Sequence, residues 1–245
     1  MARFKRHDGR RANQLRPARL IPGFVRTADG SCLIELGGTR VICTASFARG
    51  LPPWREGTGQ GWVTAEYGML PASTASRKPR PLQRPDSRSV EIQRLIGRAL
   101  RAVVRPDRLG ENTVTIDCDV LEADGGTRTA SITGACVALA LALKARCPEG
   151  SSPASILDGA VAAVSVGLLD GAAVLDLDYQ EDAAAAVDMN VAMTSRGRFV
   201  EVQATGEHGA FDERRLHEML RLARTGIRQL LRLQRQALTS RGART

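Results

Sequence analysis

The chain has 245 residues, 43% of them hydrophobic, so it is long enough to bury a substantial core as one large domain or two small ones. Lysine and arginine total 35 against 26 aspartate and glutamate, and the net charge of +9 favours polyanionic partners such as nucleic acid. The apolar runs near Ala135 and Ala160 reach only about half a membrane span, and residues 1–11 are too charged for a signal peptide, so we expect a soluble protein that makes no membrane contact.

The first third of the chain alternates between cationic segments and short strands. Residues 1–19 are too polar for a core, and we interpret them as an extended basic arm. Two strands, 31–36 and 40–46, form a hairpin at Gly37-Gly38, and a third strand covers 61–67. Residues 71–87 combine prolines with cations, which is typical of a mobile basic loop.

The remaining elements alternate between helices and strands without a regular repeat. Helical spacing covers 87–103 and ends before Pro106. A strand at 114–120 and a helix ending at Lys144 follow, with the clearest internal break at 150–153. Further strands are expected at 161–169, 174–178, 190–194 and 199–205, followed by a last helix at 212–238. This order predicts an α+β fold with mixed sheets and packed helices.

The five cysteines lie at positions 32, 43, 118, 136 and 147 and form no C-x-x-C pair. Cys118 and Cys136 fall on the apolar faces of their elements, where a free thiol behaves as a small buried hydrophobe. An odd number of cysteines without a disulfide framework indicates a reducing compartment, so we expect a cytoplasmic location.

A turn at Gly125-Gly126 is the first feature that points to chemistry. Within residues 117–144, a two-residue alternation precedes the turn and helical spacing follows it. A turn from strand to helix directs free N–H groups and the positive end of the helix dipole at one point. Arg128 adds a forked cationic donor there, which suits phosphate. The pattern indicates an anion site, but an ordinary tight turn with a solvated arginine has the same local sequence.

Five carboxylates crowd a later segment: Asp176, Asp178, Glu181, Asp182 and Asp188. Magnesium prefers one or two carboxylates, with water and substrate oxygens completing its coordination, so a metal site can be formed from part of this set. A solvated acidic turn is the alternative that the spacing leaves open. Ser–His–Asp chemistry is excluded because no serine lies in a Gly-x-Ser-x-Gly elbow.

Taken together, these stretches resemble one family. The run Leu121-Glu-Ala-Asp-Gly-Gly-Thr-Arg-Thr-Ala-Ser-Ile-Thr-Gly-Ala-Cys136 is similar to the signature of the bacterial ribonuclease PH family, and the stretches 59–71, 90–98, 161–167 and 188–191 agree with it. The resemblance spans about residues 8 to 238. It implies a single ribonuclease PH domain over residues 1–245, related in fold to the second domain of ribosomal protein S5.

The resemblance also implies an activity and an assembly. Members of this family are phosphorolytic 3′ exoribonucleases, or tRNA nucleotidyltransferases, which trim tRNA precursors and other RNA 3′ ends with inorganic phosphate as co-substrate. The expected assembly is a homo-oligomer, a hexameric ring built as a trimer of dimers. The competing class is a non-catalytic RNA-binding subunit of an exosome-like ring, which lacks the phosphate cradle or the paired aspartates.

Site residues follow from the matched motifs. The family's phosphate-binding residues correspond to Arg88, Gly126, Thr127 and Arg128. Its paired aspartates correspond to Asp182 and Asp188, which the resemblance implies to be catalytic and to bind Mg²⁺ or Mn²⁺. Ala186 stands where the family often has a glutamate, which leaves the aspartate pair itself unchanged.

RNA contacts are expected from the cations of the 71–87 loop and of the helix that follows it, and the basic arm at 1–19 is expected to add RNA affinity that does not depend on sequence. Aromatic residues make up only 4% of the chain, so phosphate contacts rather than base stacking should dominate binding and make it depend strongly on salt. The residues expected to contact RNA are Arg77, Lys78, Arg80, Arg84, Arg94 and Arg98.

Overall fold

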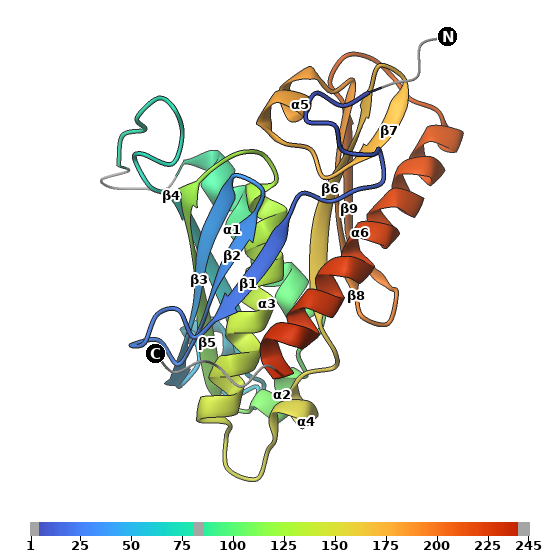
Figure 1. Cartoon of the computed structure of the whole chain (residues 1–245). Coiled ribbons are helices and arrows are strands. Elements are labelled where there is room, and N and C mark those ends of the chain that lie inside the picture. Colours follow the sequence, from blue (N-terminus) through green and yellow to red (C-terminus); the bar gives the residue numbers. More distant parts are fainter. Residues whose placement is uncertain (1–4, 81–85, 240–245) are drawn as a thin grey trace.

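Two β-sheets flank one long helix in this computed structural model, which describes residues 5–80 and 86–239 (Figure 1). The first sheet contains, in spatial order, β1 (Ala18–Pro22), β2 (Gly30–Leu36), β3 (Thr39–Arg49), β5 (Asn112–Glu122) and β4 (Trp62–Met69). Only β4 and β5 are parallel, and the other neighbours are antiparallel. The second sheet is antiparallel and contains β7 (Ala172–Leu175), β6 (Val161–Leu169), β8 (Val187–Thr194) and β9 (Phe199–Gly206). Mixed pairing confirms the predicted α+β class.

The central helix is α3 (Thr127–Arg146), which contacts β2 and β3 on one side and β6 on the other. It is the one helix in the described residues that is long and apolar enough to cross a bilayer, and 72% of its apolar window is buried inside the protein. A helix covered on both sides must be apolar all round, so its place between the sheets accounts for its composition.

Two further long helices cover the sheets. Helix α1 (Ser87–Arg101) packs on β4, while α6 (Glu213–Thr239) packs on β6 and β7. Both are amphipathic, because each buries only one face. The remaining helical segments are short: η1 (Pro53–Arg55), α2 (Pro106–Leu109), α4 (Pro153–Ile156) and α5 (Tyr179–Ala184).

Close packing fixes α3 against the first sheet. A Cβ atom at Gly134 would lie 2.8 Å from Cys43 Sγ and 2.9 Å from Ile34 Cγ2, so only glycine allows this approach. One buried cluster joins the first sheet to α1 and α3, and a second joins the other sheet to α6. Cys118 and Cys136 are buried and free, as predicted.

Most predicted elements are confirmed, with differences at their ends. The hairpin at Gly37-Gly38, the strand at β4 and the three long helices are present. Helix α1 ends at Arg101, and Pro106 starts α2 instead of stopping α1. The strand predicted at 174–178 ends at Leu175, because Asp176 adopts a left-handed backbone conformation with φ of 57°. Strand β1 and the short helices were not predicted.

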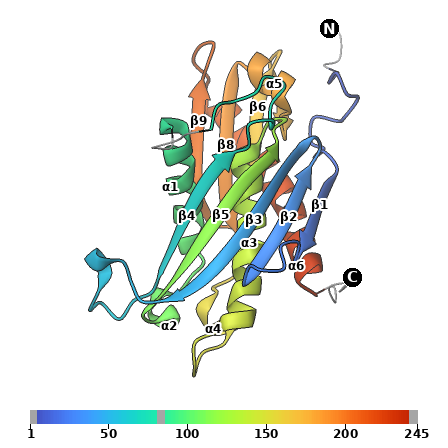
Figure 2. The same cartoon turned by 90° about the vertical axis from the view of Figure 1, so that its left-hand side faces the viewer.

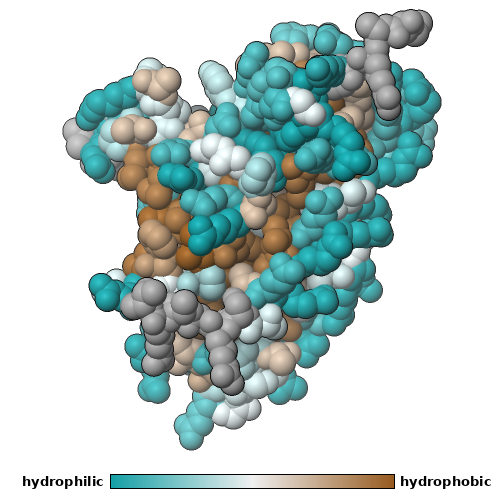
Figure 3. All heavy atoms as spheres, viewed as in Figure 1, coloured by the Kyte–Doolittle hydropathy of each residue, from teal (hydrophilic) through white to brown (hydrophobic). Residues whose placement is uncertain are grey.

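The outer surface differs between regions. Figure 2 views the first sheet face on, with its five strands in front of α3. In Figure 3, hydrophobic residues gather in the middle of one face, and hydrophilic residues cover the region of α5 and the N-terminal arm. An apolar area of this kind on a folded chain is typical of a surface that another molecule covers.

Candidate active site

An open pocket of about 410 Å³ lies where the N-terminal ends of α1 and α3 meet α5 and β8. It brings together segments that are far apart in the sequence, since its lining runs from Met69 to Asn190. Its lining includes every residue that the family resemblance assigned to phosphate and metal: Arg88, Gly126, Thr127, Arg128, Asp182 and Asp188.

The Gly125-Gly126 turn forms one wall of this pocket. Both glycines have positive φ, 73° and 67°, and Gly126 is the left-handed N-cap of α3, with no side-chain cap hydrogen bond in the described part of the chain. The hydroxyls nearby have other roles: that of Thr127 pairs with the Tyr67 hydroxyl at 2.9 Å, and that of Thr129 donates to the Gly126 carbonyl. The free N–H groups of the first turn of α3 are therefore available to an anion.

Two arginines add positive charge to the turn. The Arg128 side chain is 17% exposed, and its Nη1 donates to Gln203 Oε1 at 3.2 Å and to Glu91 Oε1 at 3.4 Å. Arg88 is the second residue of α1, where the positive end of the helix dipole disfavours a cation. An anion bound between these two guanidinium groups would relieve that repulsion.

The opposite wall carries the two aspartates. Asn190 Nδ2 donates to Asp188 Oδ2 at 3.0 Å, whereas Asp188 Oδ1 is buried and has no hydrogen-bond partner among the described residues. Burial, followed by repulsion from Asp182, raises the pKa of Asp188 to about 6. Much of Asp182 is exposed to solvent, but its carboxyl group is partly buried, and this burial raises its pKa. The positive charge of Arg128 acts in the opposite direction and lowers the pKa of Asp182.

These two carboxylates fit a hard divalent cation. An orphaned buried oxygen on Asp188 costs free energy unless a proton or a cation meets it. Magnesium uses one or two protein carboxylates and completes its shell with water and phosphate oxygens, which the open pocket admits.

The other three carboxylates of the acidic segment do not line the pocket, and they are not exposed to solvent as a solvated acidic turn would be. Asp176, Asp178 and Glu181 are buried. Their partners are arginines of the N-terminal arm. Arg6 donates through Nε to Glu181 Oε1 at 2.7 Å, and Arg10 Nη2 lies 3.1 Å from Glu181 Oε2.

The structure therefore limits the expectation that the basic arm at 1–19 binds RNA. Residues 1–4 lie outside the described residues, and within residues 5–19 Arg6 and Arg16 are buried and neutralise the protein's own carboxylates. Their charges are not available to RNA. The error arose because an arginine-rich stretch looks the same in sequence whether its partner is solvent, nucleic acid or a distant acidic segment.

Two of the cations expected to contact RNA, Lys78 and Arg80, line the pocket or the cavity beside it. Lys78 lines the pocket itself. It also lines an adjoining cavity of about 300 Å³ together with Arg80 and Arg88. Arg77 and Arg94 are exposed, Arg98 is exposed and pairs with Glu201 at 3.0 Å, and Arg84 lies outside the described residues.

Sequence reasoning missed several residues at the pocket. Ser165 lines it and accepts the Leu177 N–H through Oγ at 3.1 Å. Its signal was present, because Ser165 is the one hydroxyl in the otherwise apolar strand β6. Tyr179 also lines the pocket and is 68% exposed, but no local pattern distinguishes it from an ordinary surface tyrosine.

Family models match two parts of the chain. A model described as the 3′ exoribonuclease family, domain 1, matches residues 14–144, and one described as domain 2 of the same family matches residues 159–226.

Curated relatives and solved structures agree with this match. The chain is 53% identical over 235 residues to Ribonuclease PH of Solibacter usitatus, covering 95% of this chain and 99% of the relative. It is 53% identical over 237 residues to Ribonuclease PH of Corynebacterium glutamicum, covering 96% and 97%. Rice Rrp46 has a TM-score of 0.77 at 18% identity, covering 96% of this chain and 100% of that chain. An Archaeoglobus fulgidus exosome chain, in a structure with RNA bound to the active site, has a TM-score of 0.80 at 22% identity, covering 92% and 91%.

Proposed function

This chain belongs to the 3′ exoribonuclease family, and we propose that it is a phosphate-dependent enzyme that shortens the 3′ ends of tRNA precursors and other RNAs. The observation that carries the proposal is the meeting of an uncapped helix start, two arginines and two aspartates in one open pocket. That set of groups matches what phosphorolysis needs, an anion cradle facing a pair of carboxylates.

The cradle holds the attacking phosphate. N–H groups at the start of α3 and the guanidinium groups of Arg128 and Arg88 surround one volume, so a phosphate there meets charge-assisted donors from several directions. Thr127 is held by Tyr67 from the buried side, which fixes the first turn of α3. Positioning of this kind supplies much of the rate of phosphoryl transfer.

The reaction exchanges the last phosphodiester bond of the RNA for the phosphoanhydride bond of a nucleoside diphosphate. An oxygen of inorganic phosphate forms a bond to the phosphorus of the last phosphodiester, and the bond from that phosphorus to the O3′ of the preceding nucleotide breaks. A nucleoside diphosphate leaves, and the shortened RNA keeps a 3′ hydroxyl once O3′ gains a proton. Burial raises the pKa of Asp188 to about 6 in the metal-free protein, so this carboxyl can supply that proton when it is not holding a cation.

A divalent cation, Mg²⁺ or Mn²⁺, is the expected cofactor. Asp182 and Asp188 would hold it, since the latter presents a buried oxygen without a partner among the described residues. When bound, the cation neutralises charge that develops on the phosphate and on the leaving oxygen.

Product analysis tests the proposal. A tRNA-like RNA with a short single-stranded 3′ tail is incubated with Mg²⁺, with and without inorganic phosphate. Nucleoside diphosphates formed only with phosphate support phosphorolysis. Monophosphates formed without phosphate would establish hydrolysis instead, and binding without any product would establish a non-catalytic RNA-binding subunit.

The non-catalytic alternative has less support. Rice Rrp46 and the Archaeoglobus fulgidus exosome chain match at 18% and 22% identity, which supports a shared fold, whereas the two Ribonuclease PH relatives match at 53%. All of the phosphate and metal residues implied by the family also line one pocket here.

Assembly and location complete the proposal. A homo-hexamer, built as a trimer of dimers, is supported by the family resemblance and by the hydrophobic area in the middle of the face in Figure 3. Free cysteines, four of them buried, fit a reducing cytoplasm. Light scattering after size exclusion would test the hexamer, for which a monomer mass of 26.3 kDa sets the scale.

A further inference from the structure

Arg16, at the end of the N-terminal arm, lies beside the pocket without lining it. Its side chain is 4% exposed, and its guanidinium contacts two segments that are far apart in sequence. On one side are the carbonyl oxygens of Asp124 and Gly125, in the turn that forms the anion cradle. On the other side is the carboxylate of Asp176, which begins the segment leading to Asp182.

We propose that Arg16 is a positioning residue that fixes the anion turn relative to Asp182, and so sets the separation between bound phosphate and the catalytic carboxylates. The inference rests on the proposed function, because it concerns the geometry of that same pocket. It assigns to the end of the N-terminal arm a part in catalysis, although its arginine does not touch the phosphate.

Arg16 binds the carboxylate of Asp176 through three hydrogen bonds. Arg16 Nη2 lies 2.8 Å from Oδ1, Arg16 Nε lies 3.1 Å from Oδ2, and the backbone N–H of Arg16 donates to Oδ2 at 2.7 Å. A forked pair with a third hydrogen bond fixes the orientation of both side chains, which a lysine could not do. Burial alone would lower the pKa of Arg16, but the hydrogen bond and charge of Asp176 outweigh it and raise that pKa.

The turn and the acidic segment also touch each other directly. A Cβ atom on Gly125 would lie 2.6 Å from the Leu177 carbonyl oxygen and 2.6 Å from the Asp178 carbonyl carbon. No side chain fits between the two backbones. A small shift of either segment is therefore transmitted to the other, and Arg16 bonds to both at this contact.

Asp176 is an unusual residue to hold in this way. It is fully buried, and its φ of 57° is a left-handed conformation that a non-glycine residue adopts only when its surroundings enforce it. Its N–H donates to the Ser165 carbonyl at 2.8 Å, and its own carbonyl accepts from Arg6 and Arg10. The bent backbone turns the chain toward α5, which carries Asp182.

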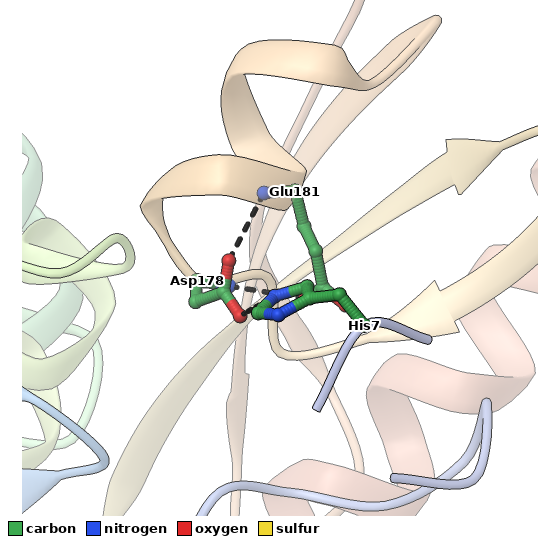
Figure 4. A group of neighbouring side chains, drawn as sticks. All are labelled: His7, Asp178 and Glu181. Atoms are coloured by element: carbon green, nitrogen blue, oxygen red, sulfur yellow. Dashed lines mark hydrogen bonds and ion pairs between the residues drawn. The ribbon is translucent and has the colours of Figure 1, made fainter. Parts of the chain in front are cut away.

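The rest of the arm holds α5 itself. Asp178 caps α5 by accepting the Glu181 N–H at 3.0 Å, and His7 Nε2 lies 2.7 Å from Asp178 Oδ2 (Figure 4). His7, Asp178 and Glu181 are close enough together to resemble a metal site. Arg6 and Arg10 already contact these carboxylates, however, so the charge is balanced by arginine and no cation is required.

The test compares Arg16→Lys and Asp176→Asn with the wild type and with Arg19→Lys, a control at an exposed arginine three residues along the same segment. Phosphate KM and kcat are measured with the tailed RNA. Thermal unfolding is recorded in parallel. KM does not depend on the folded fraction of the sample, so the comparison holds even for a partly unfolded variant.

If Arg16 positions the pocket, both variants raise the phosphate KM and lower kcat per folded molecule, so that kcat/KM falls on the order of 10- to 100-fold, the scale expected for a misplacement of about 1 Å. In the double variant, kcat/KM should fall by much less than the product of the two single-variant effects, because both substitutions remove the same interaction between Arg16 and Asp176. Arg19→Lys should match the wild type.

An unchanged phosphate KM, with kcat reduced only in proportion to the folded fraction, would overturn the inference and leave Arg16 with a purely structural role. If Arg16→Lys does not fold, the isosteric Asp176→Asn variant decides in the same way. Failure of the proposed function is recognised separately, because the wild type would then show no phosphate requirement at all.

Discussion

Asp188 and Asp182 share one wall of the pocket, and the charge of Asp182 adds to burial in raising the pKa of Asp188 to about 6. One oxygen of Asp188 accepts a hydrogen bond from Asn190, whereas the other is buried with no hydrogen-bond partner among the described residues. The pair is therefore unstable as two bare carboxylates and is satisfied by a proton or a cation between them.

Replacing either aspartate by asparagine should lower the turnover rate rather than the affinity for substrates. For Asp182→Asn and Asp188→Asn we expect kcat to fall on the order of 100-fold or more, with phosphate and RNA affinity nearly unchanged, because the lost charge acts mainly in the transition state. Steady-state kinetics with the tailed RNA measure this. Asp170→Asn, at an exposed turn, serves as the control.

Metal rescue separates two roles of the aspartates. High Mg²⁺ or Mn²⁺ should partly restore a variant whose metal site is weakened, but should not restore one that has lost a proton donor. Wild-type rates in both variants would show that neither carboxylate takes part in the reaction.

The raised pKa of Asp188 predicts a pH effect on the stability of the protein kept metal-free with a chelator. Below about pH 4 the carboxyl is protonated in both the folded and the unfolded state and contributes nothing. As the pH rises from about 4 to about 6, the unfolded state loses this proton first, so the group makes unfolding progressively more favourable.

Asp188→Asn removes this titration. The melting temperature of Asp188→Asn should therefore rise relative to that of the wild type as the pH increases from 4 to 7. Above pH 7 the difference between the two melting temperatures should stay constant. Differential scanning calorimetry across that range measures it. A difference that is constant with pH would mean that the pKa of Asp188 lies near its ordinary value.

Arg128→Ala should weaken phosphate use. Arg128 lies in the first turn of α3, and its side chain lines the pocket and is only 17% exposed, so its loss removes a charged donor worth about 1.5–3 kcal/mol, or roughly ten- to a hundredfold in phosphate KM. RNA affinity and the melting temperature should change little. Arg146→Ala, at an exposed arginine paired with Asp29, provides the matched control. A normal phosphate KM in Arg128→Ala would remove this residue from the cradle.

The loop cations should control how RNA binding depends on salt. Neutralising Arg77, Lys78, Arg80 and Arg84 together should weaken tRNA binding for all sequences alike and reduce the slope of log affinity against log salt. The reduction should reach up to about 0.7 for each phosphate of a single strand that these cations neutralise in the wild type. Fluorescence anisotropy at several salt concentrations measures the slope. If the slope stays unchanged, these side chains face solvent or another subunit.

Local patterns in the sequence determined much of the fold and most of the pocket. The hairpin at Gly37-Gly38, the apolar helix α3 and the uncapped turn before it depend on interactions within a few residues, so periodicity and turn chemistry were sufficient to predict them. The motif matches then located Arg88, Arg128, Asp182 and Asp188, all of which line one pocket.

Only the tertiary structure decided which charges meet. The sequence displays an arginine-rich arm and an acidic segment about 160 residues later, but nothing local indicates that Arg16 and Asp176 form a buried pair. Pairing over that distance depends on β1 of the first sheet and β7 of the second sheet both packing against α6, which is a product of packing across the whole chain. For this reason the arm was expected to bind RNA, whereas the fold uses it to hold the protein's own carboxylates in place.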